Sequence, residues 1–83
     1  MARARRLLED ILSRRDPQGY YVVVFEQPSE TLGEVLREVE EKLRAGFVVE
    51  DIGSIVIVRS RSRNAVKELV LAALKRGLRI KTG

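Results

Sequence analysis

The hydrophobic period of this chain switches between the repeat of a strand and the repeat of a helix. Residues 20–26 and 55–58 are valine-rich runs that are apolar on both alternating faces, which predicts strands covered on both sides. Residues 31–43 and 66–74 instead space their apolar side chains three and four positions apart, which predicts amphipathic helices. Because each pattern suits one kind of element, their order along the chain constrains the fold most strongly.

The complete order adds a helix before this pattern and a strand after it. The Asp16-Pro17-Gln18-Gly19 turn ends the first helix, and the Ile52-Gly53-Ser54 connection predicts a hairpin. Cleanly alternating side chains near residue 80 predict a half-exposed edge strand. The expected elements are a helix over 4–15, a strand over 20–26, a helix over 31–45, strands over 47–51 and 55–58, a helix over 63–76 and a strand over 78–82.

Capping residues support the boundaries of the second and third helices. Pro28 and a capping box from Thr31 to Glu34 predict the start of the second helix. Gly46 predicts its C-terminal cap, and Gly77 has the same role after the third helix. The local signals therefore agree with the hydrophobic repeat.

This order predicts an α+β fold, the ferredoxin-like βαββαβ two-layer sandwich with an additional N-terminal α-helix. We expect a single domain over 1–83, in which 1–19 form the helix and turn and 20–83 form the core. The first helix could cover the sheet face opposite the other helices, which would explain why the central strands are apolar on both sides. If that face is open instead, its apolar side chains predict a homodimer through the sheet face.

The residue types that are missing exclude many activities. The chain has no cysteine and no histidine, so it lacks disulfides, thiolate chemistry and the commonest acid–base group and metal ligand. We therefore predict a protein that is not an enzyme, with no catalytic residues, no metal site and no cofactor. The apolar runs are too short to span a membrane and no signal peptide is recognised, so we expect a soluble, cytoplasmic protein with no membrane partner.

Charge is strongly segregated along the chain. Residues 1–15 sum to +3, residues 16–51 to −6 and residues 52–83 to +7, which gives the net +4. Most of the cations are arginines, which favour planar contacts with phosphate or carboxylate. An arginine-rich surface without a specific role is the alternative explanation. The last third of the chain is the basic part in which an anion site is expected.

Three arginines follow the second valine-rich strand at alternate positions. In an extended chain Arg59, Arg61 and Arg63 share one face at a spacing of roughly 6.6 Å, beside the positive end of the next helix. Such a row attracts phosphates, so we predict a nucleic-acid partner, with RNA favoured over DNA. The predicted nucleic-acid-binding residues are Arg59, Arg61, Arg63, Lys67, Arg79 and Lys81.

The residues of this strand-to-helix loop also have structural interpretations. The arginines could pair with the acidic second helix at Glu34, Glu38 or Glu41, as solvated surface charge. Ser60 and Ser62 are interpreted as helix caps rather than as catalytic hydroxyls. Both interpretations predict a loop that serves folding alone.

Aromatic side chains are few and lie together in the first strand. Tyr20, Tyr21 and Phe25 could stack on nucleic-acid bases, but core packing is the favoured interpretation. The strand over 55–58 offers isoleucine and valine where a standard RNA-recognition motif needs stacking aromatics. We therefore exclude that motif.

Two stretches carry resemblances to known families. Residues 16–28 read Asp-Pro-Gln-Gly-Tyr-Tyr-Val-Val-Val-Phe-Glu-Gln-Pro, and with the helix that follows to residue 45 they resemble the second half of bacterial ribosomal small-subunit protein six. That family has a ferredoxin-like fold and binds ribosomal RNA beside a protein partner. The βαββαβ order and residues 27–33 also resemble the regulatory modules called ACT domains, although the Pro-Gly pair before the helix is absent. The resemblances imply a fold and RNA contact, and they assign no binding residue.

Two other functions stay open on the sequence. A protein-interaction or regulatory module would form a homodimer, with the arginines as solubilising charge. An engineered idealised α/β scaffold with no biochemical activity would also show this agreement of caps, periodicity and short loops. Binding to polyanions distinguishes a nucleic-acid module from both.

Overall fold

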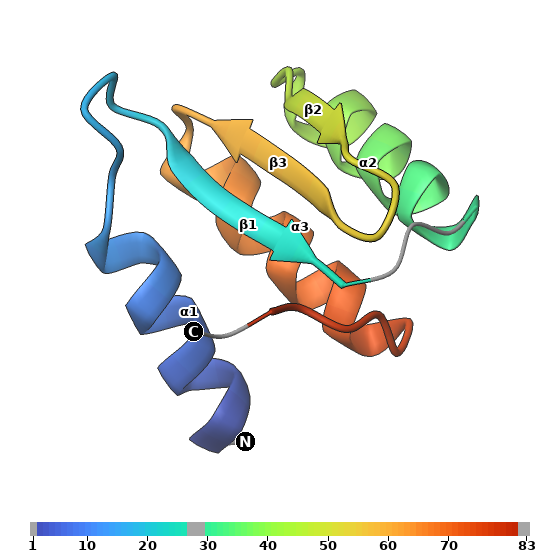
Figure 1. Ribbon diagram of the computed structural model, residues 1–83, viewed down its shortest axis with the longest axis horizontal. Coiled ribbons are helices and arrows are strands. Elements are labelled where there is room, and N and C mark those ends of the chain that lie inside the picture. The colour runs from blue at the N-terminus through green and yellow to red at the C-terminus, as the bar shows by residue number, and fades with distance from the viewer. Residues whose placement is uncertain (1, 27–29, 82–83) are drawn as a thin grey trace.

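The computed structural model describes residues 2–26 and 30–81, with side chains from Arg5 onward (Figure 1). These ranges form a compact α+β fold, as the order of the sequence patterns predicts. The helices are α1 (Ala2–Ser13), α2 (Glu30–Leu43) and α3 (Arg63–Lys75), and the strands are β1 (Tyr21–Phe25), β2 (Val48–Asp51) and β3 (Val56–Ser60).

The three strands form one antiparallel sheet in the order β1-β3-β2. β3 is central, with its Val58 opposite Val23 of β1 on one side and Val49 of β2 on the other. The predicted hairpin is confirmed, since β2 pairs with β3 across a tight connection in which Gly53 has a φ of 98°. β1 and β2 are therefore the outer strands.

The segment after α3 does not form the full strand predicted over 78–82. Within the described residues it makes one isolated antiparallel bridge, between Ile80 and Phe25. A backbone hydrogen bond of 2.7 Å, from the Lys81 N–H to the Val24 carbonyl, supports the bridge. Phe25 is the last residue of β1, so the segment meets β1 only where that strand ends. The predicted four-stranded sheet is therefore reduced to three strands and a bridge.

The helices α2 and α3 lie on one face of the sheet, behind the strands in the view of Figure 1. Alternate residues of β1 and β3 point toward this layer and are buried, while the residues between them are half-buried. β1 and β3 are therefore fully buried on one face only, and the prediction that they are covered on both sides is wrong. The core contains Ile11, Tyr21, Val23, Phe25, Leu32, Val35, Leu36, Val39, Val56, Val58, Val66, Leu69, Val70 and Ala73.

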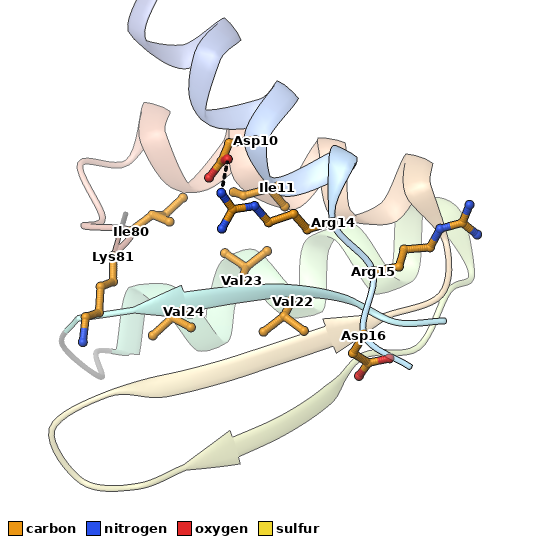
Figure 2. Close-up of a pocket in the computed structure, with 10 residues that line it drawn as sticks. All are labelled: Asp10, Ile11, Arg14, Arg15, Asp16, Val22, Val23, Val24, Ile80 and Lys81. Carbon is orange, nitrogen blue, oxygen red and sulfur yellow. Dashed lines mark ion pairs between the residues drawn. The ribbon is translucent and has the colours of Figure 1, made fainter. Parts of the chain in front are cut away.

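α1 lies on the helix side of the sheet, against α3 and β1. Its buried Ile11 belongs to the same core as Val23, which points toward α1 while Val22 and Val24 point away (Figure 2). The expectation that this helix covers the opposite face is therefore wrong. Its apolar stripe completes the core beside α3, and the short turn at Asp16 returns the chain directly into β1.

α3 is capped at both ends, as the sequence predicts for Ser62 and Gly77, whereas Ser60 is the last residue of β3 and its hydroxyl accepts a hydrogen bond from the Ser62 N–H. The Ser62 hydroxyl accepts a hydrogen bond of 3.1 Å from the Ala65 N–H, which makes Ser62 the N-cap. At the other end Gly77 has a φ of 76°, and the Leu78 N–H donates to the Ala73 carbonyl at 2.9 Å, as in a Schellman motif. These caps fix how the chain enters and leaves the helix layer.

Both ends of α2 differ from the prediction. The helix begins at Glu30, so Thr31 lies inside it and is not its N-cap, and Pro28 lies outside the described residues. The helix also ends before Gly46, and Arg44 takes the left-handed conformation with a φ of 51°. A residue with a Cβ is strained there, because its side chain approaches the following carbonyl.

Candidate nucleic-acid interface

The sheet face opposite the helices carries two of the predicted arginines, and we call it the open face. All three helices pack on the other side of the sheet or beyond its β1 edge (Figure 1). Residues directly opposite each other on neighbouring strands share a face, so the register identifies its members. Two rows cross the open face, Val22 with Arg59 and Val48, and Val24 with Ile57 and Glu50.

Arg61 stacks on Tyr20 at the start of β1. The guanidinium carbon lies 4.6 Å from the centroid of the ring. Since Tyr21 pairs with Ser60, the next two positions, Tyr20 and Arg61, continue the sheet as another row of the open face. Arg61 is exposed and Tyr20 is half-buried. The pair presents a guanidinium and an aromatic ring, held together by a cation–π contact, to the solvent side of the sheet.

The three aromatic residues of the first strand separate into two environments. Tyr21 and Phe25 are only 5% and 1% exposed, which confirms core packing for both. Tyr20 is not a member of the buried core and contacts Arg61 instead. The core-packing interpretation is therefore right for two of the three, and the alternation of a strand explains the difference.

Arg59 lies in the middle of the open face and pairs with Glu50. Its Nη1 is 3.3 Å from Glu50 Oε1, and the two side chains are 33% and 55% exposed. A surface pair of this kind stabilises by about 0 to 1 kcal/mol, so a phosphate can compete for the guanidinium. The glutamates Glu34 and Glu38 instead pair with Arg76, at 3.3 and 2.8 Å. The partner of Arg59 is therefore on the sheet and not on α2.

Arg63 and Lys67 lie on a different part of the molecule. α3 begins at Arg63, so the chain leaves the extended conformation after Ser62 and the predicted row is interrupted after Arg61. Both Arg63 and Lys67 are exposed on α3, whose buried residues face the sheet. The structure brings Arg59 and Arg61 together and separates the other two cations from the open face.

Arg79 and Lys81 lie at the opposite end of β1. Ile80 pairs with Phe25, whose side chain is buried on the helix side of the sheet. Because side chains alternate along an extended chain, Arg79 and Lys81 point toward the open face. Figure 2 shows Lys81 pointing to the same side as Val24 and away from Ile80. Both cations are exposed. The open face therefore has cations at both ends of β1.

A cavity of about 310 Å³ lies along the outer edge of β1, beneath α1 (Figure 2). Its carboxylates are already engaged within the chain. Asp10 pairs with Arg14 at 3.2 Å, and Asp16 accepts hydrogen bonds from the N–H groups of Gln18 and Tyr20, at 2.9 and 2.8 Å. These contacts hold α1 and its turn, so the charges that the cavity offers to a ligand are those of Arg15 and Lys81.

Comparisons with known proteins leave the family open. No family model, curated protein or solved structure matches this chain. The resemblances to ribosomal small-subunit protein six and to ACT domains therefore stay predictions. Within the described ranges no three potential metal-ligating side chains gather into a site, and no helix there has the length and apolarity to cross a bilayer.

Sequence reasoning did not identify Glu50 as a member of this surface, and it assigned Tyr20 to the core. Tyr20 and Val22 are two positions apart in an extended segment, so they share a face. This spacing could have placed the tyrosine on the less buried face. The contact between Glu50 and Arg59 depends on the register of β2 against β3, which the turn at Gly53 sets. That register could not be read from periodicity alone.

Proposed function

We propose that this chain is a non-enzymatic module that binds single-stranded nucleic acid, RNA in preference to DNA, across the open face. The observation that carries the proposal is the Arg61 guanidinium stacked on Tyr20 with Arg59 on the same face. Aromatic rings and guanidinium planes offer stacking surfaces to unpaired bases of any sequence. The same arginines attract the phosphates that link those bases.

The shape and polarity of the open face favour a single strand over a duplex. Val22, Val24 and Ile57 form a half-buried apolar floor on which unpaired bases can lie. A duplex hides its bases and offers this flat surface only phosphates, and RNA exposes unpaired bases in loops and ends. This preference for exposed bases is why we favour RNA.

Cations at both ends of β1 set the length of the proposed site. The five residues from Tyr21 to Phe25 separate Arg61 at one end from Arg79 and Lys81 at the other. At a rise of about 3.3 Å per residue the two ends are about 13 Å apart along the strand. The site would therefore hold a short run of nucleotides with low sequence specificity, because phosphate contacts position a chain without reading it.

We also propose that the fold is the ferredoxin-like βαββαβ arrangement with an N-terminal helix and a shortened last strand. The strand order β1-β3-β2 and the bridge from Ile80 to the outer side of β1 support this. In that arrangement both crossover helices lie on one face of the sheet. The opposite face then stays free for a ligand.

The alternative of a homodimer through the open face is less well supported. Two copies packed face to face would bury Arg59 and Arg61, and desolvating these charges is unfavourable unless each finds a partner. An engineered scaffold without activity predicts that no polyanion binds at all.

The test compares two double variants that remove the same charge from different surfaces. Arg59→Ala with Arg61→Ala removes the open-face cations, whereas Arg63→Ala with Lys67→Ala removes two cations from α3. We measure the fluorescence anisotropy of labelled single-stranded RNA, duplex RNA and duplex DNA at about 50 and 200 mM salt. We expect wild type to prefer the single strand, the open-face variant to lose about tenfold or more in affinity, and the α3 variant to lose less than about threefold.

Replacing Tyr20 by Leu separates stacking from charge. This variant should weaken single-stranded RNA binding by about fivefold or more and leave the salt dependence unchanged, because one stacked base contributes about 1 to 3 kcal/mol without a phosphate contact. Circular dichroism checks that each variant is folded. Equal losses in the two double variants, or no binding by wild type at low salt, would overturn the proposed function.

A further inference from the structure

Within the described residues β2 is an outer strand whose side chains stay exposed, although α2 lies on one side of the sheet behind it (Figure 1). All four of its residues are exposed, and Val48 and Val49, which face opposite sides of the sheet, are 48% and 49% exposed. Ile52, directly after the strand, is 56% exposed. α2 packs against α3 and makes no close backbone approach to β2. Apolar side chains therefore stand exposed on both faces of one strand.

The outer edge of β2 also presents unpaired backbone groups. In β1 the Val24 carbonyl bonds to Lys81, so even-numbered residues of β1 point away from β3 and odd-numbered ones point toward it. In β3 the backbone of Val58 therefore points toward β1 and that of Arg59 toward β2. Val48 is opposite Arg59, so its backbone points toward β3 and that of Val49 points outward. The N–H and C=O groups of Val49 and Asp51 are thus aimed at the outer edge of β2, and those of Phe47, directly before the strand, would be too if it extended the strand.

The features that protect sheet edges from pairing are confined to one half of β2. Proteins blunt such edges with lysine, proline, bulges or charged side chains. The register of β2 with β3 has no bulge, and 47–49 contain no charge. The carboxylates of Glu50 and Asp51 follow, and each already has a partner, in Arg59 and in the Gly53 N–H at 2.8 Å. The first half of the strand is therefore free to pair.

We propose that β2 pairs antiparallel with β2 of a second copy of this chain, about a two-fold axis at Val48. In this register Val48 meets its own copy, and Phe47 of each copy meets Val49 of the other. Phe47 and Val49 supply the outward backbone groups, so both ladders can form. The two sheets would join into one sheet of six strands.

Charge selects this register over its neighbours. A two-fold axis at Glu50 would set that carboxylate against its own copy, which is destabilising. An axis at Val49 would place Asp51 against the Phe47 ring. With the axis at Val48 both carboxylates lie beyond the paired half, beside the 44–46 segment of the second copy, where Arg44 is exposed. The strand is thus self-complementary in one register, which makes a second copy the fitting occupant.

The absence of cysteine makes the register directly testable. Directly opposed residues in a pair like Val48 with its copy have Cα atoms about 4.5 Å apart, within disulfide range. We expect Val48→Cys to form an intermolecular disulfide at least tenfold faster under mild oxidation than Glu50→Cys, whose two copies would be about 13 Å apart. Leu71→Cys, exposed on α3, measures random collision. Crosslinking that is fastest at position 50, or equal at 48 and 71, would overturn the proposal.

Solution mass of the full chain gives the second measurement. Wild type should sediment as a dimer that dissociates on dilution, and Val49→Lys should raise the dimer dissociation constant at least tenfold while circular dichroism stays unchanged. Ile57→Lys, which changes the open face, should leave the dimer intact. A wild-type monomer at all concentrations up to about 1 mM, or a dimer broken by Ile57→Lys and not by Val49→Lys, would contradict β2 pairing.

Discussion

The two outer strands of the sheet carry valines at equivalent positions that meet very different surroundings. Val23 of β1 and Val49 of β2 both lie opposite Val58, on the helix side of the sheet. Val23 is 1% exposed and Val49 is 49% exposed. The difference arises because α1, α3 and the bridge at Ile80 surround β1, whereas α2, the helix on the same side of the sheet as Val49, packs against α3 and leaves Val49 exposed. Both residues are valines on the same side of the sheet, so tertiary packing alone makes the edge at β1 buried and the edge at β2 exposed.

The β1 edge contributes stability, and the β2 edge is available for binding. A buried valine gains the free energy of leaving water and fills space that nothing else fills. A half-exposed valine gains little and leaves an apolar surface that a partner can cover. The comparison therefore predicts which substitutions affect folding and which affect association.

The largest expected effect is at the two equivalent valines. Val23→Ala should lower the free energy of unfolding by about 2 to 3 kcal/mol, through lost burial and the cavity that remains. Val49→Ala should lower it by less than about 1 kcal/mol, because the side chain is already half in water. Urea unfolding at low protein concentration measures both without a contribution from association. Equal losses would mean that β2 is buried in solution.

A second matched pair uses isoleucines next to the two edges. Ile11→Val, in the helix that guards β1, should cost about 1 kcal/mol of unfolding free energy, as removal of a buried methylene does. Ile52→Val removes the same group beside β2, where the side chain is 56% exposed, and should stay within about 0.5 kcal/mol. Thermal or urea unfolding compares them. A loss of unfolding free energy at residue 11 no larger than that at residue 52 would show that α1 does not bury the edge of β1.

The helices α3 and α2 also differ in the residue that ends each of them. α3 ends through Gly77, whereas α2 ends through Arg44, and both residues have positive φ, of 76° and 51°. Arg44→Gly should therefore raise the unfolding free energy by about 0.5 to 1 kcal/mol, because glycine removes the strain of the left-handed conformation.

The matched control for that substitution is Arg37→Gly, inside α2. It should lower the unfolding free energy by about 1 kcal/mol, since glycine is unfavourable in a helix interior. Urea midpoints compare both variants with wild type. A destabilisation by Arg44→Gly would mean that the left-handed conformation at the end of α2 does not persist in solution.

The smallest effect is expected at the ion pair between the central strand and the β2 edge. Glu50→Gln should lower the unfolding free energy by no more than about 1 kcal/mol, because the pair is solvent-exposed. The same change should tighten RNA binding by a few-fold, since it releases the Arg59 guanidinium and removes a negative charge from the open face. Anisotropy at low salt measures this gain. Weaker binding would show that Arg59 needs Glu50 to hold a productive position.

Much of the architecture could be predicted because the signals are local. The order of elements from α1 to α3, the hairpin at Gly53, and the caps at Ser62 and Gly77 all follow from residues within a few positions of one another. The ends of α2 could not, because Arg44 adopts a strained conformation that propensity disfavours. Of the predicted site, Arg59 and Arg61 lie together, while Arg63 belongs to α3 because its N-cap precedes it.

By itself the sequence determined the alternation of its elements, the apolar stripe of each helix and the charge of its last third. Periodicity and capping act through the backbone of a few neighbouring residues, so they are legible before folding. Only the tertiary structure decided that α1 packs on the helix side of the sheet, that the other face stays open and that the side chains of β2 stay exposed. Those outcomes depend on which elements pack together, and a valine in a strand has the same local pattern whether or not a helix covers it.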